Sequence, residues 1–259
     1  MDEITRTPVL GVGVSAVNLE SAAAAILGWI ESGRRGDLQK RYVTVTGVHG
    51  VIEAQDDPGF KKILNGSGMT VPDGMPLVWL SRLAGRSHVT RVYGPDLTLA
   101  VSGALGERGL SAYYYGGAAG VAEALALELE GRFPGLRCAG TFTPPFRQLT
   151  LEEEQEIARL INASKADIVW VGLSTPKQER WMARLRESLQ PPVLVGIGAA
   201  FDFLTGRARQ APRWMQRSGL EWLFRLATEP RRLSKRYLRN NPLFLYYLAC
   251  EKLRLKRFE

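Results

Sequence analysis

The carboxylate of Asp73 has the setting that most directly suggests chemistry. It follows the short β-prone segment 69–72 and precedes Gly74 and an amphipathic helical pattern. In open α/β sheets, ligands bind in the crevice outside the carboxyl ends of the strands, so this position predicts a ligand site. Asp also commonly caps a helix through its side-chain oxygen. On this segment alone the capping interpretation is the stronger, and the rest of the chain favours the ligand site.

Two glycine clusters follow other apolar strands and could approach a phosphate. Gly116 and Gly117 lie at a strand-to-helix turn, where a helix N-terminus offers free N–H groups and a favourable dipole. The spacing is neither the dinucleotide pattern nor a P-loop, and a tight turn without a ligand is nearly as well supported. In the second cluster, 196–202, nucleotide binding and a packing role with Asp202 as a helix cap are equally well supported.

The segment 172–179 also follows an apolar strand. Pro176 suits the first turn of a helix, so Lys177 and Gln178 are predicted to project at the crevice. There a charge and an amide could hold a sugar phosphate. The alternative is a solvated charged face, but the combination of strand, turn and proline favours binding.

The histidines and cysteines predict no metal site. His49 and His88 have no Cys, Asp or Glu at metal-ligand spacing, and Cys138 and Cys250 are far apart. His49 could line the crevice, although a histidine at a helix start without catalytic duty is the more common case. No Asp-x-Asp pair is present to hold a divalent metal. A diphosphate leaving group would therefore rely on arginines and helix N-termini.

The C-terminal part of the chain is helical in pattern and strongly basic. Arg232, either Lys235 or Arg236, and Arg239 recur at three- or four-residue spacing and therefore share one helical face. A basic amphipathic helix is typical of a surface that binds anionic membrane. An exposed helix that binds nothing and a nucleic-acid stripe are the alternatives. The interleaved aromatic and apolar residues favour the membrane.

The elements that must position these residues alternate between strands and helices. This alternation predicts an α/β fold, Rossmann-like, with a largely parallel sheet and helices on both faces. We predict a catalytic core over 1–206 and a helical, membrane-associating appendage over 207–259. The predicted strands are 9–14, 41–46, 69–72, 111–115, 137–141, 167–171 and 193–197. In the appendage we predict helices over 214–228, 231–240 and 243–258, separated by prolines that cannot continue a helix.

The overall composition limits the kinds of partner and location that the protein can have. The 259 residues are 45% hydrophobic and carry a formal charge of +8, which predicts an anionic partner. The longest apolar runs fall short of the ~20 residues that span a bilayer, and the N-terminus resembles no signal peptide. We therefore expect a cytoplasmic protein, soluble or attached to the inner face of the membrane.

Six motifs, taken in order, resemble the WecG/TagA/CpsF family of bacterial glycosyltransferases, glycosyltransferase family 26. The resemblance extends over most of the chain, and six motifs in this order are specific. They are Thr-Val-Pro-Asp-Gly-Met-Pro (70–76), Arg-Val-Tyr-Gly-Pro-Asp (91–96), Tyr-Tyr-Gly-Gly (114–117), Gly-Leu-Ser-Thr-Pro-Lys-Gln-Glu (172–179), Gly-Ile-Gly-Ala-Ala-Phe-Asp (196–202) and Gly-Leu-Glu-Trp-Leu-Phe-Arg (219–225). The segment 46–55 further resembles the xanthan-type glucosyltransferase branch.

The resemblance implies an inverting, metal-independent transfer without a cofactor. A hexose would pass from a UDP-sugar to a polyprenyl-diphosphate-linked sugar at the cytoplasmic face of the membrane, in exopolysaccharide or other cell-surface glycan synthesis. Many family members have an asparagine where Gly47 stands here. This difference favours glucose over N-acetylmannosamine, with N-acetylmannosaminyl or N-acetylmannosaminuronosyl transfer as the alternative within the family.

The resemblance also implies roles for individual residues. Asp73 matches the general base that deprotonates the acceptor hydroxyl, and Asp202 matches a nucleotide contact. The positions that match other substrate contacts are Arg91 and Gln178 in the active site, and Arg225, Arg232 and Lys235 at the lipid diphosphate.

Two rival classes of function can be tested against this prediction. In a basic nucleic-acid-binding protein, Asp73 and the motif at 172–179 would have no function. A dinucleotide-dependent oxidoreductase is disfavoured because this chain lacks the glycine fingerprint of that class. We therefore expect no nucleic-acid partner. The sequence leaves the donor sugar, the acceptor linkage and the oligomeric state open, a homo-oligomer included.

Overall fold

The computed structural model describes residues 4–258, which form two compact units. Unit 1 contains residues 4–18, 45–93 and 209–258, and unit 2 contains residues 19–44 and 94–208. The basic C-terminal segment therefore belongs to the same compact unit as Asp73. The predicted division into a 1–206 core and a 207–259 appendage stays a prediction.

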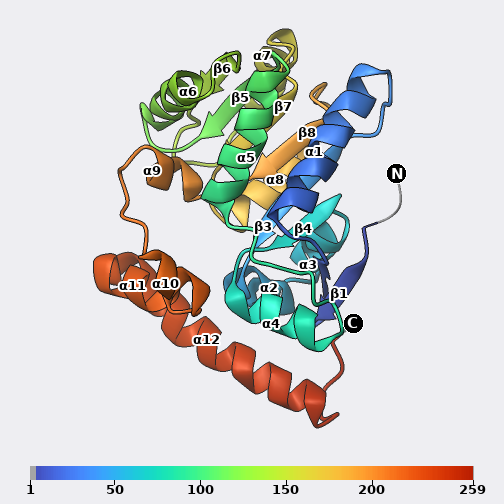
Figure 1. Cartoon of the computed structure of the whole chain (residues 1–259), viewed down its shortest axis with the longest axis vertical. Coiled ribbons are helices and arrows are strands. Elements are labelled where there is room, and N and C mark those ends of the chain that lie inside the picture. Colours follow the sequence, from blue (N-terminus) through green and yellow to red (C-terminus); the bar gives the residue numbers. More distant parts are fainter. Residues whose placement is uncertain (1–3, 259) are drawn as a thin grey trace. The chain divides into compact units, whose positions relative to one another are not determined.

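A six-stranded parallel sheet organises the fold and confirms the predicted α/β class (Figure 1). Its strand order is β4-β3-β8-β7-β5-β6. The bounds are β3 (Arg41–Thr46), β4 (Met69–Pro72), β5 (Ser111–Gly116), β6 (Arg137–Phe142), β7 (Ile168–Gly172) and β8 (Val193–Gly196). The inner strands are apolar along most of their length because helices cover a parallel sheet.

Unit 2 carries helices packed on this sheet. Helices α1 and α5 pack against each other, α6 lies along β5 and β6, and α8 lies along β8 (Figure 1). The helices of this unit are α1 (Leu19–Arg34), α5 (Gly94–Glu107), α6 (Val121–Arg132), α7 (Leu151–Ala163), α8 (Lys177–Leu185) and α9 (Ala200–Leu204). The longer of these helices bury apolar residues that recur at helical spacing.

Unit 1 contains a two-stranded antiparallel sheet and six helices among its described residues. Besides β4, its elements are β1 (Arg6–Val9), β2 (Val12–Ser15), α2 (Val48–Asp56), α3 (Pro58–Asn65), α4 (Met75–Leu83), α10 (Arg213–Arg217), α11 (Glu221–Thr228) and α12 (Pro230–Lys252). The predicted single strand over 9–14 is wrong, because Leu10 and Gly11 both have positive φ and turn the chain back. Two such residues form the tight hairpin turn that matches strand twist.

The helices of the C-terminal segment also differ from the prediction. The predicted helix over 214–228 is two helices, α10 and α11, separated at Gly219, whose φ is +76°. Conversely, α12 continues through Pro242, where the sequence predicts a break. Pro242 is exposed, so water can satisfy the carbonyl that loses its partner. Phe244 is buried in a hydrophobic cluster with α2 and α3, which holds the helix in place.

Within residues 4–258, no helix is both long enough and apolar enough to span a bilayer. Helix α12 has 23 residues, but basic side chains interrupt its apolar ones.

Candidate functional site

Asp73 lies directly after β4, with its carboxylate partly exposed. Its backbone N–H donates to the carbonyl oxygen of Thr46 at 2.9 Å, which continues the alignment of β3 and β4 by one residue. The side chain is 32% exposed, and Oδ1 lies 3.1 Å from Nη2 of Arg91. Helix α4 begins after Gly74 and has no side-chain cap. The structure therefore contradicts the helix-cap interpretation and leaves a carboxylate held by an arginine at a strand end.

Arg91 lies between two carboxylates. Its Nη2 also lies 2.6 Å from Oε2 of Glu221, the first residue of α11. Its Nε donates to the backbone carbonyl of Asp73, and its guanidinium lies 4.2 Å from the ring centroid of Tyr93. Burial alone would lower the pKa of Arg91, but the charges of Asp73 and Glu221 outweigh burial and raise it. Arg91 is thus a permanent cation fixed from three sides.

Glu221 is the more buried of the two carboxylates. Its side chain is 13% exposed, and burial raises its pKa although Arg91 opposes the shift; the nearby charge of Asp73 raises it further. Arg225 contributes a second favourable charge from the same helix. Burial and the two carboxylates also raise the pKa of the Tyr93 hydroxyl. These residues form an interconnected charged site within unit 1.

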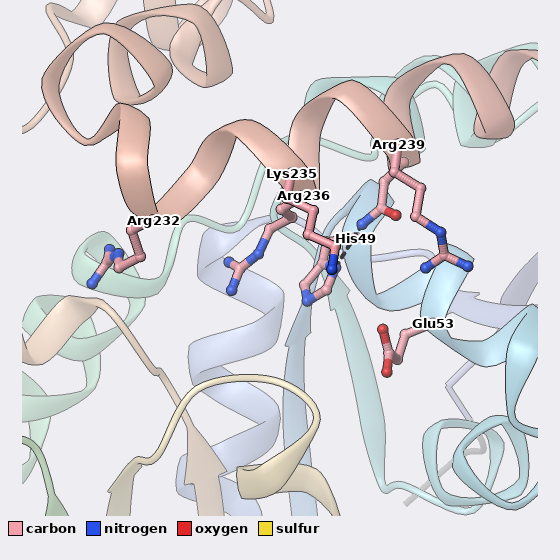
Figure 2. Close-up of a pocket in the computed structure, with 7 residues that line it drawn as sticks. His49, Glu53, Arg232, Lys235, Arg236 and Arg239 are labelled. Carbon is pink, nitrogen blue, oxygen red and sulfur yellow. Dashed lines mark hydrogen bonds between the residues drawn. The ribbon is translucent and has the colours of Figure 1, made fainter.

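A basic cavity of about 260 Å³ lies beside α12 in the same unit. Figure 2 shows side chains of α12 directed toward α2, which supplies His49 and Glu53. The lining residues are His49, Glu53, Arg232, Lys235, Arg236, Arg239 and Asn240. The prediction that basic residues of α12 share one face is therefore confirmed.

Positive charge dominates this cavity, because four cations and one carboxylate line it. Arg239 is paired with Asp56 at 2.7 Å, and Arg232 with Glu229 at 2.6 Å. Burial lowers the pKa of Arg236, and the neighbouring arginines lower it further. The side-chain amide of Asn240 lies 2.8 Å from Nδ1 of His49, which fixes the imidazole at the cavity wall. Such crowded positive charge is suited to a phosphate or diphosphate.

In unit 2, Gln178 and Glu179 form a buried polar pair. Gln178 is 2% exposed and Glu179 is fully buried, which contradicts the solvated-face alternative for Glu179. Nε2 of Gln178 donates to Oε1 of Glu179 at 3.1 Å, and the Thr175 hydroxyl donates to the same oxygen at 2.8 Å. Burial raises the pKa of Glu179. Gln178 is thus buried at the start of α8, where Lys177 is exposed, and a contact of either side chain with a substrate stays a prediction.

Steric crowding explains why glycine occupies these motif positions. A Cβ on Gly196 would lie 3.0 Å from Nε2 of Gln178, and one on Gly198 3.3 Å from its Oε1. At the end of β5, a Cβ on Gly116 would lie 2.7 Å from the backbone of Gly172, and Gly117 has φ +78°. These glycines allow the ends of β5, β7 and β8 to approach closely. The structure thus accounts for the clusters by packing, and nucleotide binding there stays a prediction.

Asp202, the predicted nucleotide contact, is partly exposed on the short helix α9. Among the described residues, no group of three His, Cys, Asp or Glu side chains gathers to hold a metal ion. His88 is exposed, with Nε2 3.0 Å from the carbonyl oxygen of Ala16.

Residue patterns alone could not identify the part that Glu221 plays. It lies in the motif 219–225, but its position beside Arg91 depends on the packing of α11 in unit 1. The contributions of Glu53 and Asn240 to the basic cavity were also missed, because a lone carboxylate or amide on a helix has no distinctive pattern.

Comparisons with known proteins bear on the chain as a whole. The model of the family "Glycosyl transferase WecG/TagA/CpsF family" matches residues 7–258. A relative from Bacillus spizizenii is 31% identical over 181 residues, covering 70% of this chain and 68% of the relative. One from Bacillus subtilis is 28% identical over 174 residues, covering 67% of this chain and 66% of the relative. Both relatives have the name N-acetylglucosaminyldiphosphoundecaprenol N-acetyl-beta-D-mannosaminyltransferase.

Both names specify N-acetylmannosaminyl transfer, the alternative within the family, and neither mentions glucose. The matched segment spans about two thirds of each relative, and neither relative belongs by name to a glucosyltransferase branch. The narrower resemblance at 46–55 therefore finds no support in them.

Proposed function

Because the chain belongs to the WecG/TagA/CpsF family of glycosyltransferases, we propose that it transfers a sugar from a UDP-sugar to a polyprenyl-diphosphate-linked saccharide. The reaction serves the synthesis of a cell-surface glycan at the cytoplasmic face of the membrane. The relatives' names support an acceptor on undecaprenyl diphosphate and N-acetylmannosamine as the transferred sugar.

Glucose is the second candidate because of Gly47. A Cβ at this position would lie 3.7 Å from the backbone nitrogen of Gly74, which follows Asp73. A side chain at position 47 would thus occupy space next to the proposed base. Glycine leaves that space open, which supports a donor or acceptor that differs from those of members with asparagine here.

Asp73 is the proposed general base, and its partial exposure at the end of β4 is the observation that carries the proposal. Its carboxylate accepts the proton of the acceptor hydroxyl as that oxygen attacks the anomeric carbon. UDP leaves from the opposite face, so the configuration inverts. Arg91 orients the carboxylate, and Glu221 is too buried to meet the acceptor.

The basic cavity beside α12 supports a site for the acceptor's diphosphate. Arg232, Lys235 and Arg236 line it from α12, and the charge of Arg225 on α11 acts on Arg236. Cationic side chains bind phosphate oxygens through charge-assisted hydrogen bonds, which offset the charge of the ligand.

The direct test is transfer to a synthetic polyprenyl-diphosphate-linked sugar, with the product analysed by mass spectrometry. UDP-N-acetylmannosamine, UDP-N-acetylmannosaminuronic acid and UDP-glucose are offered in parallel. We expect an added N-acetylhexosamine mass. An added hexose would instead select glucose, and no product from any UDP-sugar, with the folded protein and membrane acceptor present, would contradict the proposed activity.

The Asp73→Asn variant tests the base. The loss of general-base assistance predicts a fall in kcat of about 10²–10⁴-fold, while calorimetric binding of UDP stays unchanged. Asp37→Asn, on an exposed loop where Asp37 pairs with Arg41, is the matched control and retains activity. Near-normal turnover of Asp73→Asn would remove Asp73 from the base role.

A further inference from the structure

We infer that Glu221 is a positioning residue that acts through Arg91 to orient Asp73, so that catalysis depends on the docking of helix α11. The inference rests on the proposed role of Asp73 as the base. It assigns the C-terminal segment a part in the chemical step, in addition to binding the lipid acceptor.

The geometry that carries this inference is the sharing of one nitrogen. Nη2 of Arg91 contacts Oδ1 of Asp73 at 3.1 Å and Oε2 of Glu221 at 2.6 Å. A guanidinium is planar, and its donors point in fixed directions. The hydrogen bonds of this plane go to Asp73, from Nη2 to Oδ1 and from Nε to the backbone carbonyl. The ion pair with Glu221 attracts the same nitrogen, so it sets where the guanidinium lies and with it the direction from which Asp73 is held.

The backbone strengthens this connection. Nε of Arg91 bonds the carbonyl oxygen of Asp73, and the N–H of Val92 donates to the carbonyl oxygen of Pro72 at 2.9 Å. The segment containing Arg91 thus runs against the end of β4. Glu221 is supplied to this arrangement by the C-terminal segment, so the docking of that segment adds a second carboxylate beside Arg91.

The position of α11 is itself fixed near Asp73. Gly219, just before α11, packs so closely on Trp79 and Met75 of α4 that a Cβ there would lie 2.8 Å from the indole ring. Helix α4 begins two residues after Asp73. Helix α11 also packs on α12. Displacement of α11 would therefore withdraw Glu221 and remove one of the two carboxylates paired with Arg91.

A general-base role for Glu221 itself fits less well. Its side chain is 13% exposed against 32% for Asp73, and its carboxylate faces Arg91. A purely structural role predicts a different result from the positioning role, because it would lower stability without a selective effect on kcat.

Glu221→Gln tests the inference in the 259-residue chain, because glutamine has the size and shape of glutamate but no charge. We expect kcat to fall by up to about 10²-fold, since a small misplacement of a reacting group has that effect. The KM for the UDP-sugar and the midpoint of thermal unfolding should change little. Glu221→Asp retains the charge and should retain more activity. Glu251→Gln on α12 is the control and keeps full activity.

A double-mutant cycle with Arg91→Lys separates positioning from structure. Lysine keeps the charge but loses the planar fork, so Glu221→Gln should add little further loss in that background. Additive losses, or a normal kcat in folded Glu221→Gln, would overturn the inference. If Glu221→Gln does not fold, the same cycle with Glu221→Asp decides between the outcomes.

The cycle also distinguishes failure of the inference from failure of the proposed function. In the Asp73→Asn background, Glu221→Gln should cause no additional loss of kcat. If Asp73→Asn is active but Glu221 and Arg91 remain coupled, the assignment of the base is wrong and the inference falls with it. If Asp73→Asn is inactive and the coupling is absent, only the inference fails.

Discussion

At the scale of single residues, the carboxylates of Glu179 and Asp73 differ in burial and therefore in function. Glu179 is fully buried, accepts hydrogen bonds from Gln178 and Thr175, and has a raised pKa because burial disfavours its charged form. Asp73 keeps a partly exposed carboxylate at a strand end. Glu179 therefore serves to hold the start of α8, whereas Asp73 is available to a substrate.

The raised pKa of Glu179 predicts how stability depends on pH. A carboxyl that binds its proton more tightly when folded stabilises the protein below its ordinary pKa of 4.5. This contribution is lost as the pH rises through the higher folded value. Glu179→Gln stays neutral, so its unfolding free energy in urea should decline less above pH 4.5 than that of the parent chain. Glu128→Gln, exposed on α6, should follow the parent curve. Parallel curves for all three proteins would contradict the prediction.

Residue patterns found part of the candidate site and missed the rest for a physical reason. Asp73 and the face containing Arg232 and Lys235 could be predicted, because a strand end and a helical period are local properties of the chain. The burial of Glu179 and the contact between Glu221 and Arg91 could not. Both depend on packing between segments distant in sequence, which no local spacing encodes.

At the scale of elements, the alternation of strands and helices was predictable, and the exceptions come from the conformation of a turn and from tertiary packing. The β1–β2 hairpin was missed because Leu10, a non-glycine residue, adopts the left-handed conformation beside Gly11. Helix α12 was predicted to break at Pro242, but tertiary packing of Phe244 outweighs the local cost of the proline.

The break between α10 and α11 offers a test at this scale. Gly219→Ala should destabilise the protein, because alanine in the left-handed region costs about 1–2 kcal/mol and its Cβ would lie 2.8 Å from Trp79. Gly85→Ala is the matched control, since Gly85 also has positive φ but no atom within 4 Å of the added Cβ. The difference in unfolding free energy isolates the contact with Trp79.

Activity should follow the same order. Gly219→Ala displaces the start of α11 and with it Glu221, so kcat should fall beyond the loss seen with Gly85→Ala. Equal stability and equal kcat in the two variants would show that the approach of Gly219 to Trp79 does not set the position of α11.

At the scale of the whole molecule, the chain has a net charge of +8, and its C-terminal segment also exposes many large apolar residues. Its large exposed apolar residues are Trp214, Leu220, Trp222, Leu223, Leu238, Leu245, Tyr246, Leu253 and Leu255. Exposed basic residues lie among them, including Arg231, Lys235 and Lys252. Aromatic, apolar and basic side chains together are typical of a helix that lies at a membrane interface.

Because Phe244 is part of the core of unit 1, deletion of the C-terminal segment would disturb folding as well as binding. Surface substitutions are therefore the cleaner test of membrane association. The 259-residue chain should sediment with vesicles that contain anionic lipid. Added salt should weaken its binding, since each basic residue near such a surface contributes about 1 kcal/mol. Binding to neutral vesicles of equal strength would contradict the electrostatic part of this prediction.

Leu245→Ser tests the apolar part, because Leu245 is 67% exposed on α12. If its side chain enters the interface, its removal should weaken vesicle binding by about tenfold or more, given about 1.5–3 kcal/mol for a fully buried leucine. Transfer to a short-chain, water-soluble acceptor should be unaffected, since Leu245 does not line the basic cavity. Leu127→Ser, on α6 and 71% exposed, is the matched control. Equal vesicle binding by the two variants would place the membrane contact elsewhere on the chain.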